Sequence, residues 1–231
     1  MAPPDPTGLR LRQDLRRLHR ALGTATVLRR AIDRLGLAAP PRRLLDLGGG
    51  DGTLLLRLAR GSPPAWRGIE VTMLDPERLV SASTRAAFAS VGWSLRTEPI
   101  ELLDWAWEDR AGVFDLGLAT LRLHRLEPDT RARLLPVLAR RTMAFVACEP
   151  RRGVLTRLGG QLLPRLLGSG PVLREHALRG ASSGLAGREL AADWPPAPGA
   201  WAVDEFPAGL FLHCFSAVRV AARARERRLP A

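Results

Sequence analysis

The sequence contains no lysine and no tyrosine, and it has only two cysteines and four histidines. The missing lysine excludes the GxxxxGK[ST] loop of mononucleotide-binding proteins, because that loop places a lysine side chain on the phosphates. Cys148 and Cys214 each lie in an apolar run, which favours core packing over a disulfide or a metal site. The histidines stand apart, without the spacing of metal ligands. We therefore expect no bound metal.

The chain also lacks long apolar runs. It has no stretch of about 18 uncharged apolar residues and no apolar centre of a signal peptide near its start, so we expect no membrane span and a cytoplasmic protein. The net charge is +12, and all 35 basic residues are arginines, which are scattered along the chain. With abundant alanine, leucine, glycine and proline, this pattern is typical of GC-rich codon usage. We interpret the charge as a basic solvated surface and expect no nucleic-acid partner.

Short apolar runs alternate with helical periodicity from Arg43 onward, which predicts an α/β fold with a doubly wound, mostly parallel sheet. Two apolar runs around a Pro-Ala-Gly turn near the end predict an antiparallel hairpin. The seven predicted strands are 44–47, 69–74, 93–100, 114–119, 143–148, 201–206 and 210–220. The predicted helices between them are 53–60, 79–91 and 128–141.

Residues 1–40 are predicted to form a proline-rich tail followed by two amphipathic helices. These helices pack on the sheet or cover a ligand; the alternative is that they contact a membrane or lipid substrate through an arginine-rich face. Residues 41–220 make up the main domain, in which residues 150–192 break the strand–helix rhythm and are predicted to be helical or irregular. Residues 221–231 are predicted to be a charged, solvated tail.

The stretch LLDLGGGDGTLLLRLA at 44–59 joins a predicted strand to a predicted helix through four glycines. Ligands of open α/β sheets bind at the carboxyl ends of the strands, and glycine allows both a sharp turn and a close approach of the ligand. The GxGxxG signature of dinucleotide-binding proteins is absent in strict form, because Thr53 and Leu55 occupy its last position. The pattern that is present is D-x-G-x-G-x-G, at Asp46, Gly48, Gly50 and Gly52.

This pattern resembles motif I of the class I S-adenosylmethionine-dependent methyltransferases. The resemblance implies the cofactor S-adenosyl-L-methionine, with its amino-acid and ribose portions against the glycine loop. It also implies that Asp46 orients the loop and faces the methionine amino group; the alternative for Asp46 is a helix N-cap. The likeness in architecture runs from roughly residue 44 to residue 220, but only motif I is highly specific.

Three later positions match the family pattern less specifically. Asp75 ends the second predicted strand, where the family has an acid that accepts both ribose hydroxyls; the alternative is a turn aspartate before Pro76. Glu101 and Leu102 follow the third strand, where family members contact the adenine; the alternative is a solvated loop carboxylate. Ala119, at the end of the fourth strand, is expected to border the cofactor.

Methyl transfer requires an aligned acceptor, and a general base is needed where the acceptor is a phenol or another hydroxyl. His124 is the candidate base, and a packed or surface histidine is the alternative. Relatives that act on small metabolites frequently carry Leu-His-His at this point, so Arg125 is a departure from the pattern. Relatives also insert substrate-covering helices in the region of residues 150–192. We therefore expect Arg152 and His176 to bind substrate; a salt-bridge role is the alternative for Arg152.

The segments DLRRLHRALG, FVACEPRR and FPAGLFLHCF resemble small bacterial methyltransferases of quinone, aromatic polyketide and phenolic lipid pathways, that is, enzymes of secondary metabolism. This likeness implies a small aromatic or phenolic acceptor, methylated on oxygen or carbon. Methylation of RNA or another macromolecule is one alternative, although the [DNS]-P-P-[FY] motif of nucleic-acid amino-methyltransferases is missing. A non-catalytic cofactor-binding protein and a dehydrogenase are the others. The oligomeric state does not follow from the sequence.

Overall fold

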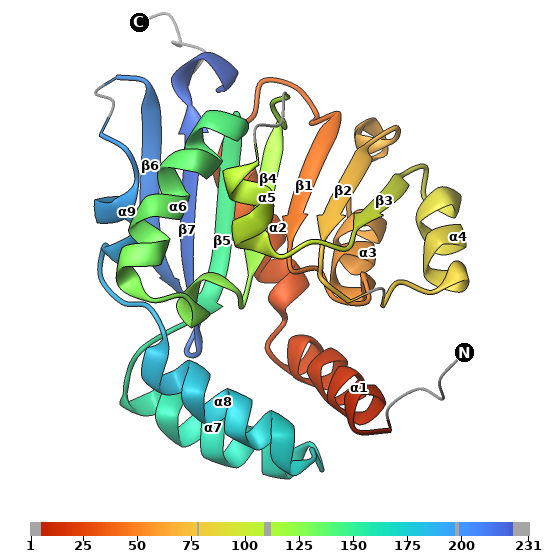
Figure 1. Cartoon of the computed structure of the whole chain (residues 1–231), viewed down its shortest axis with the longest axis vertical. Helices are drawn as coiled ribbons and strands as arrows, with labels where there is room; N and C mark the ends of the chain where they lie inside the picture. The colour runs from red at the N-terminus through yellow and green to blue at the C-terminus, as the bar shows by residue number, and fades with distance from the viewer. Residues whose placement is uncertain (1–5, 78, 109–111, 197–198, 224–231) are drawn as a thin grey trace, which may run out of the picture.

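A computed structural model describes residues 6–77, 79–108, 112–196 and 199–223. Within these residues, seven strands form one sheet in the order β3-β2-β1-β4-β5-β7-β6 (Figure 1). The neighbours among β1 to β5 pair in parallel, and β7 pairs antiparallel with both β5 and β6. The predicted doubly wound, mostly parallel sheet with a C-terminal hairpin is confirmed. The strands are β1 (Arg43–Leu47), β2 (Glu70–Leu74), β3 (Ser94–Glu98), β4 (Leu116–Thr120), β5 (Ala144–Pro150), β6 (Trp201–Ala208) and β7 (Leu212–Arg219).

Helices cover both faces of the sheet. One apolar core lies between the sheet and α2 (Thr24–Arg34), α3 (Thr53–Arg60) and α4 (Ala82–Ser90). A second core lies on the other face, under α5 (Leu102–Trp107), α6 (Pro128–Arg141) and α9 (Glu189–Asp193). Coverage on both sides explains why the central strands read as almost unbroken apolar runs.

Three more helices lie beyond the carboxyl ends of the parallel strands. They are α1 (Pro6–Ala21), α7 (Val154–Leu166) and α8 (Pro171–Ser183), and they form a separate layer below the sheet in Figure 1. Of the two predicted N-terminal helices, α2 therefore packs on the sheet, and α1 lies over its carboxyl edge. None of the helices in the described ranges has the length and apolar character needed to cross a bilayer.

The element boundaries differ from the predicted ones where local chemistry overrides periodicity. The start of α4 is later than predicted because the Ser81 hydroxyl caps the helix by accepting a hydrogen bond from the Thr84 amide at 3.1 Å. Helix α5 was not predicted at all, because six residues are too few to show a helical period. Pro207 continues β6 instead of starting the turn, which an edge strand tolerates. Of the predicted charged tail 221–231, residues 224–231 lie outside the described residues.

Cys148 of β5 and Cys214 of β7 are register partners on neighbouring strands, and both are fully buried and unbridged. The prediction that they fill the core is confirmed.

Gly117 of β4 tests how tightly the sheet packs. A Cβ at Gly117 would lie 2.7 Å from the Phe145 ring and 2.9 Å from the Thr142 methyl group, and both side chains are fully buried. We predict that Gly117→Ala lowers the free energy of unfolding by about 1–3 kcal/mol, measured by urea denaturation.

The matched control is Gly61→Ala at the end of α3. Gly61 has φ −86°, and the atoms nearest to the position that a methyl group would take there lie 3.6 Å or more away. This variant should be as stable as the wild type or more stable by about 0.4–1 kcal/mol. Equal stability of the two variants would contradict the packing argument.

Candidate active site

The glycine loop after β1 is shaped by its backbone angles. Gly48, Gly50 and Gly52 have φ of +76°, +57° and +77°, the left-handed region that glycine adopts without steric cost. The Gly48 amide donates to the Leu74 carbonyl at 2.8 Å, which ties the loop to the end of β2. Gly52 then begins α3 as its N-cap. The sequence has glycine at every second position here because three of the five residues of the bend adopt the left-handed backbone conformation.

Asp46 lies directly beneath this bend. A Cβ at Gly49 would overlap the Asp46 carboxylate and come within 2.8 Å of Met73, so only glycine fits above it. Asp46 is 6% exposed and accepts no hydrogen bond from any residue that the structure describes. Burial, and secondly repulsion from Asp75, raise its pKa to about 7. The alternative of an N-cap at Asp46 is wrong, because Asp51 is the residue whose carboxylate accepts the Thr53 amide, at 2.9 Å.

Asp75 faces the same bend from the end of β2. One oxygen, Oδ2, accepts the Gly50 amide at 3.0 Å, and the other, Oδ1, accepts the Glu77 amide at 3.0 Å. The Asp75 side chain thus stabilises the turn before Glu77, as the turn alternative predicted, and also lies beside the glycine loop, as the resemblance predicted. The ribose contact itself stays a prediction.

A cavity of about 300 Å³ lies over the bend, bounded by the glycine loop, Asp46, Asp75, the end of β4 and α1. From β4 it is lined by Leu118 and Thr120, whereas Ala119 between them is buried in the core on the opposite face. The Ala119 side chain therefore points away from this cavity, because neighbouring residues of a strand point to opposite faces. A contact of Ala119 with the cofactor stays a prediction.

Glu101 and Leu102 do not line this cavity either. The Glu101 side chain is 58% exposed and forms an ion pair with Arg122 at 3.3 Å. Leu102 is buried in the core beneath α5, because the chain forms a helix there instead of a loop. A contact of these two residues with an adenine stays a prediction.

Helix α1 contributes residues to this cavity that the sequence analysis missed. Arg16 contacts the loop through Asp51, with Nε 2.6 Å from Oδ2. His19 also lines the cavity, and burial lowers its pKa to about 4 although Asp51 opposes the shift, so its ring is neutral at pH 7. The spacing of the leucines in α1 predicted that one face of the helix is buried. It did not predict that this face lies over the cavity.

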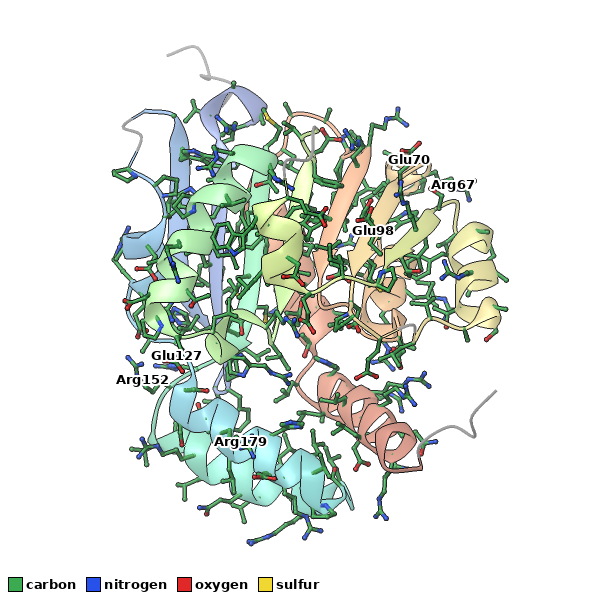
Figure 2. The ribbon with its side chains drawn as sticks, in the orientation of Figure 1. Arg67, Glu70, Glu98, Glu127, Arg152 and Arg179 are labelled. Atoms are coloured by element: carbon green, nitrogen blue, oxygen red, sulfur yellow. The ribbon has the colours of Figure 1, made fainter. Side chains whose placement is uncertain are left out.

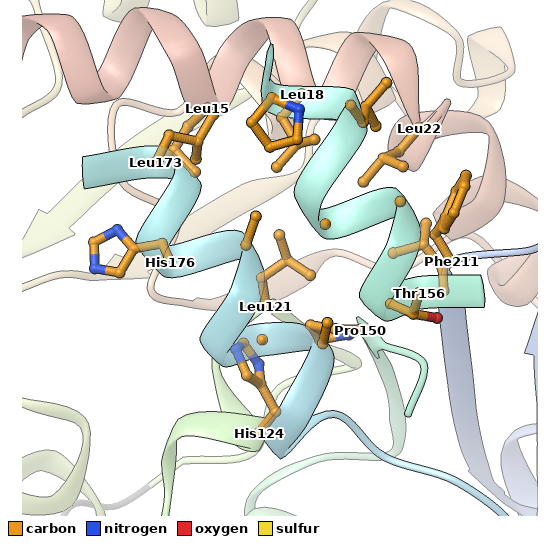
Figure 3. A pocket seen from close by; sticks show the side chains of 18 of the residues that line it. Leu15, Leu18, Leu22, Leu121, His124, Pro150, Thr156, Leu173, His176 and Phe211 are labelled. Carbon is orange, nitrogen blue, oxygen red and sulfur yellow. The ribbon is translucent and has the colours of Figure 1, made fainter. Parts of the chain in front are cut away.

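A second, apolar cavity of about 80 Å³ lies between α1, α7 and α8 (Figure 3). Leu15, Leu18 and Leu22 of α1 line it together with residues of both other helices. It shares Leu15, Leu121 and Arg125 with the first cavity, so the two are neighbours. Leu121 has φ +52° and is the only non-glycine residue with positive φ in the described ranges. Strain of this kind clusters at functional sites.

His124 lies on the wall of the apolar cavity, in the short 3-10 helix η2 (Leu123–Arg125). Its Nδ1 is 2.6 Å from Oε2 of Glu149, which is fully buried at the end of β5. Because a carboxylate accepts, we assign the proton to Nδ1, and Nε2 is then free to accept a proton. Nε2 is 3.6 Å from the point where Gly180 would carry a Cβ, so α8 leaves room beside it. The pairing with Glu149 was not predicted.

Arg152 and His176 lie at the outer side of the same region, on an open polar cavity that His124 also lines. Arg152, which Figure 2 labels between the sheet and the α7–α8 layer, forms an ion pair with Glu189 and donates to the Gly184 carbonyl at 3.3 Å. The salt-bridge alternative therefore describes its contacts. His176 borders both this cavity and the apolar one. Its Nδ1 is buried without a hydrogen-bond partner among the described residues, and burial followed by Arg125 lowers its pKa.

No family model and no curated protein matches the sequence. Solved structures do match over most of the chain. The plantazolicin methyltransferase BpumL, solved in complex with SAH, matches with a TM-score of 0.62 at 11% identity, over 94% of this chain and 91% of that one. The chain has the class I methyltransferase fold.

Two further structures with the methyltransferase fold match at a similar level. The mitomycin 7-O-methyltransferase MmcR has a TM-score of 0.55 at 19% identity, over 87% of this chain. An O-methyltransferase family protein from Burkholderia thailandensis has a TM-score of 0.50 at 16% identity, over 80%. This chain spans only 54% and 52% of these two proteins. In the part of the chain that the structure describes, no group of three or more His, Cys, Asp or Glu residues is placed to hold a metal ion.

The raised pKa of Asp46 predicts a pH dependence of stability. Its pKa is about 7 in the fold against 3.8 as the ordinary value, so the folded state binds the proton more tightly. This contribution to stability is complete below the ordinary value and is lost as the pH rises through about 7. Asp46→Asn has no proton to lose. The free energy of unfolding of this variant, relative to wild type, should therefore increase between about pH 5 and about pH 8.

Urea denaturation of both ligand-free proteins at the two pH values measures this difference. A gap between variant and wild type that stays constant across the range would show that Asp46 does not titrate there.

Proposed function

We propose that this chain is an enzyme that transfers a methyl group from S-adenosyl-L-methionine to a small, apolar, hydroxyl-bearing acceptor, of aromatic or phenolic type. The observation that carries the proposal is the arrangement of two carboxylates around the glycine bend. Asp46 lies beneath it with no hydrogen bond from a described residue, and Asp75 faces it from β2. The likeness in fold to BpumL, which was solved with SAH, supports the same cofactor.

The residues present fit this cofactor. An ammonium group beside Asp46 would favour the charged carboxylate and offset the effect of burial, as opposite charges do. Asp75 would hold the ribose hydroxyls. The bare backbone at Gly50, where no described residue beyond its chain neighbours has an atom within 4 Å of the position of a Cβ, would face the ligand. When bound, the cofactor supplies a methyl group already activated on a sulfonium.

The apolar cavity is the proposed acceptor site. It adjoins the cofactor cavity through Leu15, Leu121 and Arg125, so an acceptor bound in it would lie next to the cofactor. Its volume of about 80 Å³ is smaller than the apolar cavity of roughly 150 Å³ that takes up benzene in another protein. A ring-sized acceptor therefore requires α7 and α8 to move, in keeping with a covering role for residues 150–192.

His124 is the proposed general base. Glu149 holds its Nδ1–H, so Nε2 is directed away from that carboxylate and can take the proton of an acceptor hydroxyl. Alignment of the acceptor by the cavity walls supplies the other part of the rate enhancement. A base at this place favours an oxygen acceptor, since a phenol must lose its proton to become a good nucleophile.

Asp75→Asn tests the cofactor site. The amide presents a donor where the carboxylate presented a second acceptor, so one of its contacts is lost. We predict a fall of about tenfold or more in affinity for S-adenosylmethionine, as expected for hydrogen bonds to a charged group, measured by calorimetric titration. The control is Asp129→Asn, at an exposed residue of α6 that does not line the cofactor cavity. Unchanged affinity in the Asp75 variant, or no binding by the wild type, would contradict the proposed site.

His124→Ala tests the chemistry separately from binding. We predict that turnover falls by about 10²–10⁴-fold, which is the usual contribution of a general base, while the affinity for S-adenosylmethionine stays the same. A panel of phenolic and quinone-type acceptors with methyl-labelled cofactor measures turnover. Full turnover in the variant would remove His124 from the mechanism. Cofactor binding without transfer to any acceptor by the wild type would favour a non-catalytic protein.

A further inference from the structure

The outer face of α7 carries an uncovered apolar stripe. Five large apolar side chains on it are at least half exposed, from 50% for Leu158 to 83% for Leu166. They recur at helical spacing and so lie along one side of the helix. The residues of this stripe are Val154, Leu155, Leu158, Leu162 and Leu166.

The stripe is separate from the face that α7 uses within the fold. That inner face packs on α8, where a Cβ at Gly160 would lie 3.1 Å from the Ala177 carbonyl, and it lines the apolar cavity with Thr156 and Leu163. The outward leucines belong to neither of the two apolar cores of the sheet. A contiguous exposed patch of this kind marks a surface that interacts with a partner.

The charged residues of the segment that carries the stripe are all of one sign. Between Pro150 and Glu175 the charged residues are five arginines, with no Asp or Glu among them. Two of these, Arg157 and Arg165, are exposed on α7 itself, and neither forms an ion pair with a residue in the described ranges. The stripe is thus apolar at its centre and positive at its border.

We propose that α7 docks on an anionic lipid surface, with the stripe in the acyl boundary and Arg157 and Arg165 on the phosphate groups. An interfacial helix combines these two features, an apolar face and flanking basic residues. A second copy of the chain fits less well. Packing α7 against α7 would bring both arginines of each copy together without a carboxylate on either helix, and like charges at an interface cost free energy.

Docking at this place has a consequence for the acceptor. The same helix has its outer face on the lipid and its inner face on the apolar cavity, so docking brings the cavity close to an acceptor dissolved in the membrane. This consequence rests on the proposed function, whereas the docking itself does not.

The test is co-sedimentation of the full chain with vesicles of phosphatidylcholine alone and of phosphatidylcholine mixed with phosphatidylglycerol. We expect binding to the anionic vesicles and weakening by high salt. L158S/L162S should reduce vesicle binding by about tenfold or more. R157Q/R165Q should lower the preference for anionic lipid by about tenfold or more, since each arginine near such a surface adds to the attraction.

Matched controls remove similar groups elsewhere. W107S/V220S replaces apolar side chains that are 53% and 50% exposed on other elements, and Arg60→Gln removes an exposed arginine from α3. Both should bind vesicles as the wild type does. Thermal melting and titration with S-adenosylmethionine establish that the α7 variants are folded.

Three results would overturn docking: no binding of the wild type to anionic vesicles, equal binding by L158S/L162S, or a dimer by light scattering that L158S/L162S disperses without any vesicle binding. Failure of the proposed function is a different result, namely vesicle binding that persists in a protein without affinity for S-adenosylmethionine.

Discussion

A single buried carboxylate fixes the end of the sheet where the two cavities meet. Glu149, fully buried at the end of β5, accepts the backbone amides of Arg122 and Leu123 at 3.1 and 3.0 Å and the Nδ1 of His124 at 2.6 Å. A buried carboxylate is costly unless its oxygens are satisfied, and here the turn after β4 satisfies them. That turn places Leu121 in its left-handed conformation between the cavities and holds the His124 ring on the wall. The chemistry proposed for this edge depends on that one group.

Sequence reasoning succeeded where the determinant is local. The alternation of Gly48, Gly50 and Gly52 reflects their own backbone angles, and the acids Asp46 and Asp75 lie on strands whose apolar pattern is plain. The predicted bounds of α3 and α6 agree with the structure for the same reason, because the signals that start and end each helix lie in the residues next to it in the sequence. The fold class followed from the rhythm of strands and helices.

The parts that sequence reasoning missed are set by packing between distant segments. Glu149 and His124 meet because β4 and β5 are neighbours in the sheet, and no spacing in the chain records that contact. Helix α5, which buries the Leu102 side chain in the core, is too short to show a period in the sequence. The face of the sheet toward which Ala119 points depends on the exact position of the residue in β4, because a shift by one residue moves a side chain to the other face. The apolar residues of α7 were predicted to belong to a helix that covers the substrate. The exposed fractions of its leucines in the structure distinguish the inner face of this helix from the outer face.

Helix α1 is attached at both ends of the site. The Asp14 carboxylate accepts the Gly170 amide at the start of α8, at 2.7 Å, and Arg16 contacts Asp51 in the glycine loop. Leu15, between them, belongs to the walls of both cavities. One displacement of this helix would uncover the two compartments together. Solvent access to one compartment is therefore mechanically coupled to solvent access to the other.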